Sequence, residues 1–385
     1  MGLLIQVSIL LTLPLLYYLL PYYQNRALHG IPGPKLAALS NFWLLYQCRR
    51  GRRYKAVDDA HQKYGPLVRL QPNHVSVADP EAIPVIYSHT GGWLKSEYYD
   101  AFVSIRRGLF NTRSRAEHTR KRKTISHTFS AKSIAQFEPY IVSNLHQLRQ
   151  QWDSLCPPPQ SNTLENGNSD NGSNDAFTTI DALPWLNYLA FDIIGDLAFG
   201  APFGMLAAGA DVATVQLSPN EPARTAPAVQ VLNRRGEVSA TLGCLPALKP
   251  WAGWLPDRFF RDGINAVKDL AGIAVARVGA RLAEEEEEGE GERKGRGKGE
   301  GRKDLLARLM DGRDENGEKL GREELTAEAL TQLIAGSDTT SNTSCAGLYW
   351  ILKTEGVQER LQAELDAAVP ADVGIPSFEM VKDLS

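Results

Sequence analysis

Uncharged and apolar residues dominate the start of the chain. The run "LLIQVSILLTLPLLYYLLPYY", from Leu3 to Tyr23, contains no charged side chain, and Gln6 and Pro14 are its least favourable members. About 20 apolar residues are needed to span a bilayer. A cleaved signal peptide would show a charged start, a shorter apolar run and a small-residue cleavage site, and none is evident. The pattern therefore predicts an uncleaved transmembrane anchor at residues 1–23.

The segment after the anchor predicts a small hairpin between two helices. "HGIPGPKLAALS" indicates a stiff, non-helical hinge, because two prolines flank a glycine. Alternation in "PLVRLQPNHVSVAD" is typical of two short strands. The predicted elements are a helix over residues 53–64 closed by Gly65-Pro66, two strands about a Pro72-Asn73 turn, and a helix opened by Asp79-Pro80 that runs through Tyr87.

From Phe129 onward the pattern is mostly helical, most clearly over residues 131–152 and 185–199. Two polar segments of low complexity, residues 157–175 and 284–303, are predicted to be solvated insertions. No internal repeat is visible. The predicted body, residues 24–385, is mainly α with a small β-sheet.

A further helix is predicted from about Leu325 to Thr354. Its bulky apolar residues recur at 3.6-residue spacing: Leu330, Leu333, Ile334, Cys345, Leu348, Ile351 and Leu352. The motif "AGSDTTS" at residues 335–341 interrupts this helix at some cost. Gly336 is about 1 kcal/mol less favourable there than alanine, and the side chains of Asp338, Thr339 and Thr340 compete for backbone hydrogen bonds.

Small residues form a column opposite the bulky face: Ala335, Gly336, Thr339, Thr343, Ala346 and Gly347. Such a column admits a second helix or a planar cofactor close to the backbone. Thr339 beside Asp338 is a plausible pair for proton delivery. Two structural alternatives stay open: a helix crossing lined with polar residues, or Ser337 or Asp338 acting as the N-cap of a new helix.

Composition narrows the functional classes. The chain has 385 residues, a formal net charge of −3 and 43% hydrophobic residues, which argues against a general nucleic-acid binder. The four cysteines show neither a CxxC motif nor zinc-ligand spacing, and we expect free thiols in a reducing compartment. Basic residues such as Arg26 and Lys35 follow the anchor, so the positive-inside rule predicts a cytoplasmic body.

A basic segment, "RAEHTRKRKTISHTFS", covers residues 115–130. As a string it is similar to a nuclear-localisation or nucleic-acid patch, and as a helix it presents a solvated basic face. On a helix, His118 and Arg122 share one side, and the Arg122 guanidinium can bind a carboxylate with two hydrogen bonds. A membrane-anchored protein has little use for a nuclear signal, so we favour the helix.

Taken together, these motifs resemble the cytochrome P450 haem-thiolate monooxygenases. An A-G-x-D-T-T helix, a proline-rich hinge after an anchor, and H-x-x-x-R followed by F-S occur in that family's order and spacing. Within the family, residues 108–141 and 185–206 are similar to the fungal benzoate 4-monooxygenases. The resemblance covers nearly the whole chain after the anchor.

The resemblance implies roles for the matching residues. Asp338 and Thr339 match the acid–alcohol pair that delivers protons during oxygen activation, and Ala335 and Gly336 match the point where the helix passes over the haem. His118 and Arg122 match positions that bind the haem propionates, although many members carry tryptophan where this chain has His118. Residues 93–110 match the mobile loop over the substrate, with candidate contacts Tyr98, Tyr99, Phe102 and Arg106.

The resemblance also implies an activity. A haem enzyme of this kind would hydroxylate a small aromatic acid such as benzoate at the para position, with O2 as co-substrate. Electrons would come from NADPH through NADPH–cytochrome P450 reductase. The body would lie in the cytoplasm, held by a single-pass anchor in the endoplasmic reticulum membrane. Membrane lipid would be a partner of the protein, and nucleic acid would not.

Two family features are missing from this sequence. The axial cysteine thiolate lies in a glycine- and arginine-containing loop near the family's C-terminus, after an E-x-x-R helix, and neither is present in that context. We therefore expect an incomplete, C-terminally truncated P450 fold without its own metal ligand, inactive as a 385-residue chain. The alternative is a non-catalytic, membrane-tethered degenerate relative. Reading the transcript past the codon for Ser385 separates the two.

Overall fold

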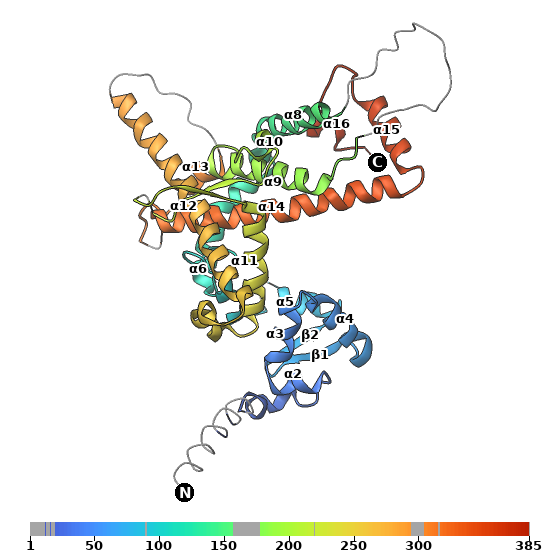
Figure 1. Cartoon of the computed structure of the whole chain (residues 1–385), viewed down its shortest axis with the longest axis vertical. Coiled ribbons are helices and arrows are strands. Elements are labelled where there is room, and N and C mark those ends of the chain that lie inside the picture. The colour runs from blue at the N-terminus through green and yellow to red at the C-terminus, as the bar shows by residue number, and fades with distance from the viewer. Residues whose placement is uncertain are drawn as a thin grey trace. The chain divides into compact units, whose positions relative to one another are not determined.

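A computed structural model describes residues 12, 16, 20–88, 91–156, 178–218, 220–293, 304–314 and 316–384 (Figure 1). The chain forms two compact units, residues 1–118 with 232–268, and residues 119–231 with 269–385. Among the described residues, no helix combines the length and apolar character needed to cross a bilayer. Most of the predicted anchor at residues 1–23 lies outside the described residues, as does the polar segment 157–175.

The first unit contains the predicted hairpin. Strands β1 (Leu67–Gln71) and β2 (His74–Val77) pair antiparallel, with Val68 opposite Ser76. Helix α4 (Arg53–Tyr64) ends at Gly65, whose φ of 97° suits glycine, and α5 (Ala82–Tyr87) follows the hairpin. The helices and the hairpin predicted over residues 53–87 are therefore confirmed. The unit also contains η1 (Arg26–Leu28), α2 (Lys35–Leu39), α3 (Phe42–Arg49), η2 (Glu97–Phe102) and η4 (Pro246–Trp254).

The proline-rich hinge lies against β1. The backbone N–H of Arg69 donates to the Pro32 carbonyl over 2.8 Å. A Cβ on Gly33 would overlap the Arg69 carbonyl oxygen, so only glycine permits this approach. One apolar cluster of the unit combines Leu44, Ala60, Val68, Leu70 and Cys244, and a second combines Ala101, Val238, Leu242, Ala252, Phe259, Phe260 and Val267.

The second unit is almost entirely helical. It contains η3 (His127–Phe129), α7 (Ala131–Ala135), α8 (Glu138–Leu155), α9 (Ala182–Phe199), α10 (Met205–Ala208), α13 (Leu305–Met310), α14 (Arg322–Lys353), α15 (Val357–Ala368) and α16 (Phe378–Val381). Two short strands, β3 (Ala213–Val215) and β4 (Arg224–Ala226), form an antiparallel pair. Helices α6 (Arg115–Ser126), α11 (Ala228–Gly243) and α12 (Arg258–Arg293) contribute residues to both units.

Helices α9 and α14 lie side by side and form the main contact of the second unit (Figure 1). At their crossing, a Cβ on Gly336 would come within 2.7 Å of Ile194 Cδ1. On α9, the Asp192 carboxylate accepts hydrogen bonds from the backbone N–H groups of Gly204, Met205 and Leu206, and so holds the start of α10.

Two predictions about segments in this unit need correction. The single helix over residues 131–152 is wrong: α7 ends at Ala135, and α8 starts at Glu138 with Pro139 in its first turn. Proline lacks the N–H that a continuous helix would need there. The insertion predicted at residues 284–303 is solvated in its acidic half, where Glu284 and Glu286 are exposed, but residues 284–293 continue α12 and do not lie between two helices; residues 294–303 lie outside the described part.

Candidate functional site

The motif "AGSDTTS" lies within one uninterrupted helix. Helix α14 runs through Arg322–Lys353, so neither Ser337 nor Asp338 caps a new helix. The hydroxyls bond to the same helix: Ser337 Oγ donates to Leu333 O and Thr339 Oγ1 to Ala335 O, each over 2.7 Å. The polar side chains are thus satisfied locally, which explains how a helix accommodates them in its middle.

The two sides of the motif have different environments. Leu330, Leu333, Ser337 and Ser341 are buried, whereas Ala335, Thr339, Thr343, Ala346 and Gly347 are exposed. Gly336 packs against Ile194 of α9. The predicted column of small residues is therefore divided, since Gly336 serves a helix crossing and the others form an exposed strip, which we call the small-residue strip. The predicted apolar face is confirmed at Leu330 and Leu333, but Leu352 is 62% exposed.

Asp338 and Thr339 are arranged differently from each other. Asp338 is half-buried, and this burial raises the pKa of its carboxyl group. Its backbone carbonyl accepts from Asn342 Nδ2 over 2.8 Å and from Ser341 Oγ over 3.2 Å. Because the Thr339 hydroxyl donates its proton to Ala335 O, its remaining lone pairs are available as acceptors. The pair thus offers two different groups, a carboxyl group with a raised pKa and a hydroxyl that can accept a hydrogen bond.

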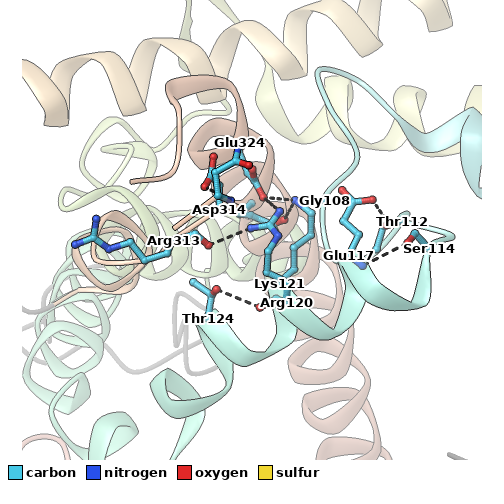
Figure 2. A network of polar contacts seen from close by, with 12 residues as sticks. Gly108, Thr112, Ser114, Glu117, Arg120, Lys121, Thr124, Arg313, Asp314 and Glu324 are labelled. Carbon is cyan, nitrogen blue, oxygen red and sulfur yellow. Dashed lines mark hydrogen bonds and ion pairs between the residues drawn. The ribbon is translucent and has the colours of Figure 1, made fainter. Parts of the chain in front are cut away.

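Helix α6 joins the start of α14 through buried charges (Figure 2). Lys121 Nζ lies 2.7 Å from Glu324 Oε1 and 2.9 Å from Glu328 Oε1, and Lys121 is 2% exposed. Arg120 also pairs with Glu324 and donates to the backbone carbonyl of Arg313. Burial of Glu324 opposes ionisation, but the hydrogen bonds from Lys121 and Arg120 outweigh it and lower the pKa of that carboxyl group.

The basic segment therefore has a structural role that the sequence did not reveal. Arg120 and Lys121 fix α6 to α14, and neither was singled out as functional. His118 is half-buried and Arg122 is exposed, one helical turn apart on α6. The shared side of His118 and Arg122 on a regular helix is as predicted, and their role toward a cofactor stays a prediction.

The four candidate substrate contacts belong to the first unit. Tyr98, Tyr99 and Phe102 lie on η2, where their rings contact each other and Phe110. Arg53 Nη1 donates to the Tyr98 hydroxyl over 3.1 Å, and Arg106 is exposed.

The predicted mobile loop at residues 93–110 is held at several backbone carbonyls. Lys249 Nζ donates to the carbonyls of Asp100 and Val103, and Arg235 Nη2 donates to that of Phe102, all over 2.7–3.0 Å. Burial lowers the pKa of Arg235 to about 10 and that of Lys249 to about 8. The sequence did not reveal that Arg235 and Lys249 hold this loop, because both residues lie more than a hundred positions from it in the chain.

The described residues fit one side of a flat cofactor but do not include a thiolate ligand for it. The small-residue strip of α14 leaves an open surface of small side chains around Ala335 and Thr339. Cys345, also on α14, packs with the apolar cluster around Leu148 and Leu186. Cys156 lies at the end of α8, and Cys48 and Cys244 lie beside each other in the first unit.

A mainly helical fold built around a long helix with this motif defines the class of protein. The family described as cytochrome P450 matches residues 32–385, and the chain belongs to that family. Among solved structures, retinoic acid bound cyanobacterial CYP120A1 matches with a TM-score of 0.58 and 15% identity, covering 87% of this chain and 63% of that one, which supports the fold alone.

Two named relatives give more specific matches than the family as a whole. The chain is 60% identical over 374 residues to benzoate 4-monooxygenase bphA of Aspergillus niger, which covers 97% of this chain and 68% of that protein. It is 28% identical over 349 residues to cytochrome P450 monooxygenase cicH of Emericella nidulans, covering 89% of this chain and 61% of the relative. The chain thus spans about two thirds of the length of the relatives it matches.

Proposed function

We propose that this chain provides the oxygen-side part of a haem-dependent monooxygenase that hydroxylates benzoate, or a similar small aromatic acid, at the para position. The observation that carries the proposal is the 60% identity to benzoate 4-monooxygenase bphA over 97% of the chain. Identity of that extent includes the α9 and α14 segments from which the candidate site is built. O2 is the co-substrate, and electrons come from NADPH through a reductase.

The haem, when bound, supplies the oxygen-activating chemistry, and the protein supplies binding, orientation and protons. Its place on this chain is the small-residue strip of α14, where the absence of large side chains around Ala335 and Thr339 supports a planar neighbour. The ion pairs from Lys121 to Glu324 and Glu328 hold α6 against the first turns of α14. This anchoring supports a fixed position for Arg122, which would bind a propionate through charge-assisted hydrogen bonds. His118 would donate a further hydrogen bond to a propionate.

Asp338 and Thr339 manage the proton. A carboxyl group with a raised pKa holds its proton at a higher pH than an ordinary aspartate does, which favours its use as a general acid. The Thr339 hydroxyl, bonded to Ala335 O, offers lone pairs on its exposed side, where it would accept a hydrogen bond. The aromatic cluster of Tyr98, Tyr99 and Phe102 supports recognition of an aromatic ring.

The anchor and the compartment complete the proposal. The uncharged run at Leu3–Tyr23 supports a single-pass anchor, with the body on the cytoplasmic side of the endoplasmic reticulum membrane. A reductase on the same membrane would then reach the body without release of either protein into solution.

Expression of the gene with a haem supply and a P450 reductase tests the function. We expect NADPH-dependent conversion of benzoate to 4-hydroxybenzoate and a carbon monoxide difference spectrum of the thiolate type. Turnover of other aromatic acids without benzoate would contradict the substrate. The absence of both signals would favour the non-catalytic relative.

A further inference from the structure

Cys48 and Cys244 lie next to each other although 196 residues separate them. Their Sγ atoms are 3.4 Å apart, and both residues belong to the first unit. Cys48 is near the end of α3, and Cys244 is the first residue after α11. Both are free thiols. A disulfide needs an S–S distance of about 2.0 Å, so a small approach of the two sulfur atoms would link them.

The backbone around Cys244 is fixed on the hairpin side. Gln71 Nε2 of β1 donates to the Cys244 carbonyl over 2.7 Å, and Cys244 is 2% exposed within the cluster that contains Leu44 and Leu70. Cys48 packs against the same cluster and remains half-buried. The juxtaposition of the thiols thus follows from the core itself and does not depend on an exposed loop.

A cavity of about 560 Å³ gives small molecules access to Cys48. Its lining includes Cys48, Gly51, Arg53, His74 and Glu237, all within the first unit. The hydrogen bond from the Cys244 thiol, and then the positive charge of Arg53, lower the pKa of the Cys48 thiol against the effect of burial. The hydrogen bond to Cys48 and burial raise the pKa of Cys244. The two sulfurs therefore differ, with the thiolate favoured on the accessible one.

We propose that Cys48 and Cys244 form a dithiol site that hydroperoxides oxidise to a reversible disulfide, with Cys48 as the attacking sulfur and Cys244 as the resolving one. The Cys48 thiolate attacks one peroxide oxygen, the O–O bond breaks, and the alkoxide leaves and takes up a proton to become an alcohol. The Cys244 sulfur then attacks the sulfenic sulfur of Cys48. The S–S bond forms, the S–O bond breaks, and the oxygen leaves as water with the Cys244 proton.

The electrons balance in this sequence. Two thiols lose two electrons in total, and one hydroperoxide gains them to become one alcohol and one water. A dithiol reductant of the thioredoxin class reverses the reaction by thiol–disulfide exchange. In a reducing compartment the site would be a dithiol at rest and a disulfide only under peroxide exposure.

Peroxide treatment of the full 385-residue chain tests the proposal without any variant. We expect hydrogen peroxide or tert-butyl hydroperoxide to produce a single peptide pair linking Cys48 to Cys244, with loss of two titratable thiols that a thioredoxin-class reductant restores. Cys156→Ser and Cys345→Ser are the matched controls and should give the same linked pair. A link involving Cys156 or Cys345 in place of either partner would overturn the proposal.

Variants then test the two roles. Cys244→Ser should accumulate a sulfenic acid at Cys48 that a dimedone-type probe labels, whereas Cys48→Ser should leave Cys244 reduced. Arg53→Gln should slow oxidation of Cys48 several-fold, while Arg52→Gln, an exposed arginine beside it, should not. Sulfinic acid at Cys48 without any linked peptide in the unmutated chain would show that Cys244 does not resolve, and the assignment would be wrong.

Discussion

Ser337 and Thr339 carry hydroxyl groups two positions apart on α14, and the fold uses them differently. Both donate to the carbonyl four residues earlier. Ser337 is fully buried, whereas Thr339 is exposed on the small-residue strip. The same local bond thus satisfies a buried hydroxyl in one case and orients an accessible one in the other. Only Thr339 can take part in chemistry outside the helix.

Thr339→Ala in the haem-loaded enzyme should uncouple oxygen consumption from product formation. Removing the hydroxyl removes the acceptor beside Asp338, so we expect several-fold less product per NADPH and a matching release of hydrogen peroxide. Product, peroxide and NADPH are measured in the same reaction. Thr340→Ala, the exposed neighbour, should couple normally. Unchanged product yield per NADPH in Thr339→Ala would refute the proton-delivery role.

Asp338→Asn should stabilise the fold at neutral pH while it lowers turnover. Burial raises the pKa of Asp338 in the folded state, so ionisation costs the fold free energy. This cost is absent below the unfolded pKa of about 3.9, and it grows as the pH rises through that value to the folded pKa. The free energy of unfolding of the variant should therefore exceed that of the unmutated chain at pH 7 and approach it at pH 4. Urea unfolding at both values tests this, and an advantage that persists at pH 4 would contradict it.

Gly336→Ala should destabilise the second unit. The added methyl would meet Ile194 Cδ1 at 2.7 Å and Cγ1 at 2.8 Å, and overpacking of this kind costs about 1–3 kcal/mol, against a gain of about 1 kcal/mol in helix propensity. Gly347→Ala on the same helix meets nothing within 4 Å and should only gain stability. Thermal unfolding compares the two, and Ile194→Ala should partly rescue Gly336→Ala. Equal stabilisation by both glycine substitutions would exclude the close crossing.

The sequence alone predicted part of this site, because some of the site residues are neighbours along the chain. Asp338 and Thr339 follow each other in the chain, so their adjacency needed no tertiary information. The division between Gly336 and Ala335 was not predictable, because it depends on Ile194, which approaches from another helix. The same reason explains why Cys48 and Cys244 looked unrelated: only the packing of α3 and α11 on the hairpin brings them together.

Helices α6 and α14 are joined by buried ion pairs between one ammonium group and two carboxylates. Breaking these ion pairs costs free energy of unfolding. Lys121→Ala removes the ammonium that Glu324 and Glu328 both bind, so we expect a loss of about 3–5 kcal/mol in the free energy of unfolding. Lys123→Ala, an exposed lysine on the same helix, should change it by less than about 0.5 kcal/mol. Denaturant unfolding measures both, and equal effects would contradict a structural role for Lys121.

The pH dependence separates charge from packing in this network. Because the folded pKa of Glu324 is lowered, its contribution is complete above the unfolded pKa of about 4.3 and is lost as the pH falls through the folded value. The deficit of Lys121→Ala should therefore stay constant from pH 7 down to about pH 5 and shrink only as the pH falls below about 4.3, where Glu324 takes up its proton. A deficit independent of pH would point to lost packing of the lysine stem instead.

Predictability of the elements followed the strength of local signals. The helix over residues 53–64 and the hairpin after it were correct, since Gly65, Pro72 and Asn73 are strong turn residues. The break between α7 and α8 was missed although Pro139 marks it. Strands β3 and β4 have three residues each, too few for a detectable period, and they exist through their mutual pairing.

At the level of the whole molecule, the order of the chain does not follow its compact units. The first unit combines residues 1–118 with 232–268, so α6, α11 and α12 each pass from one unit to the other. A composition-based division into an anchor and one continuous body could not anticipate this, because both units have ordinary globular composition.

The membrane attachment predicted from the uncharged run at Leu3–Tyr23 can be tested by fractionation. If Leu3–Tyr23 spans the bilayer, the full chain should sediment with membranes and resist carbonate extraction, because about 20 apolar residues hold it in the hydrocarbon core. Removal of residues 1–23 should shift most of the protein to the supernatant. A second variant keeps the length of the segment and replaces Leu10 and Leu16 with arginine, which costs about 2.5–3.5 kcal/mol for each charge near the centre of a span. This variant should also release the protein to the supernatant. Carbonate-resistant sedimentation of the deleted chain would show that another surface binds the membrane, and release of the full chain would exclude the span. The distinction matters for electron supply, since a tethered body meets a membrane-bound reductase in two dimensions, whereas a released one must find it from solution.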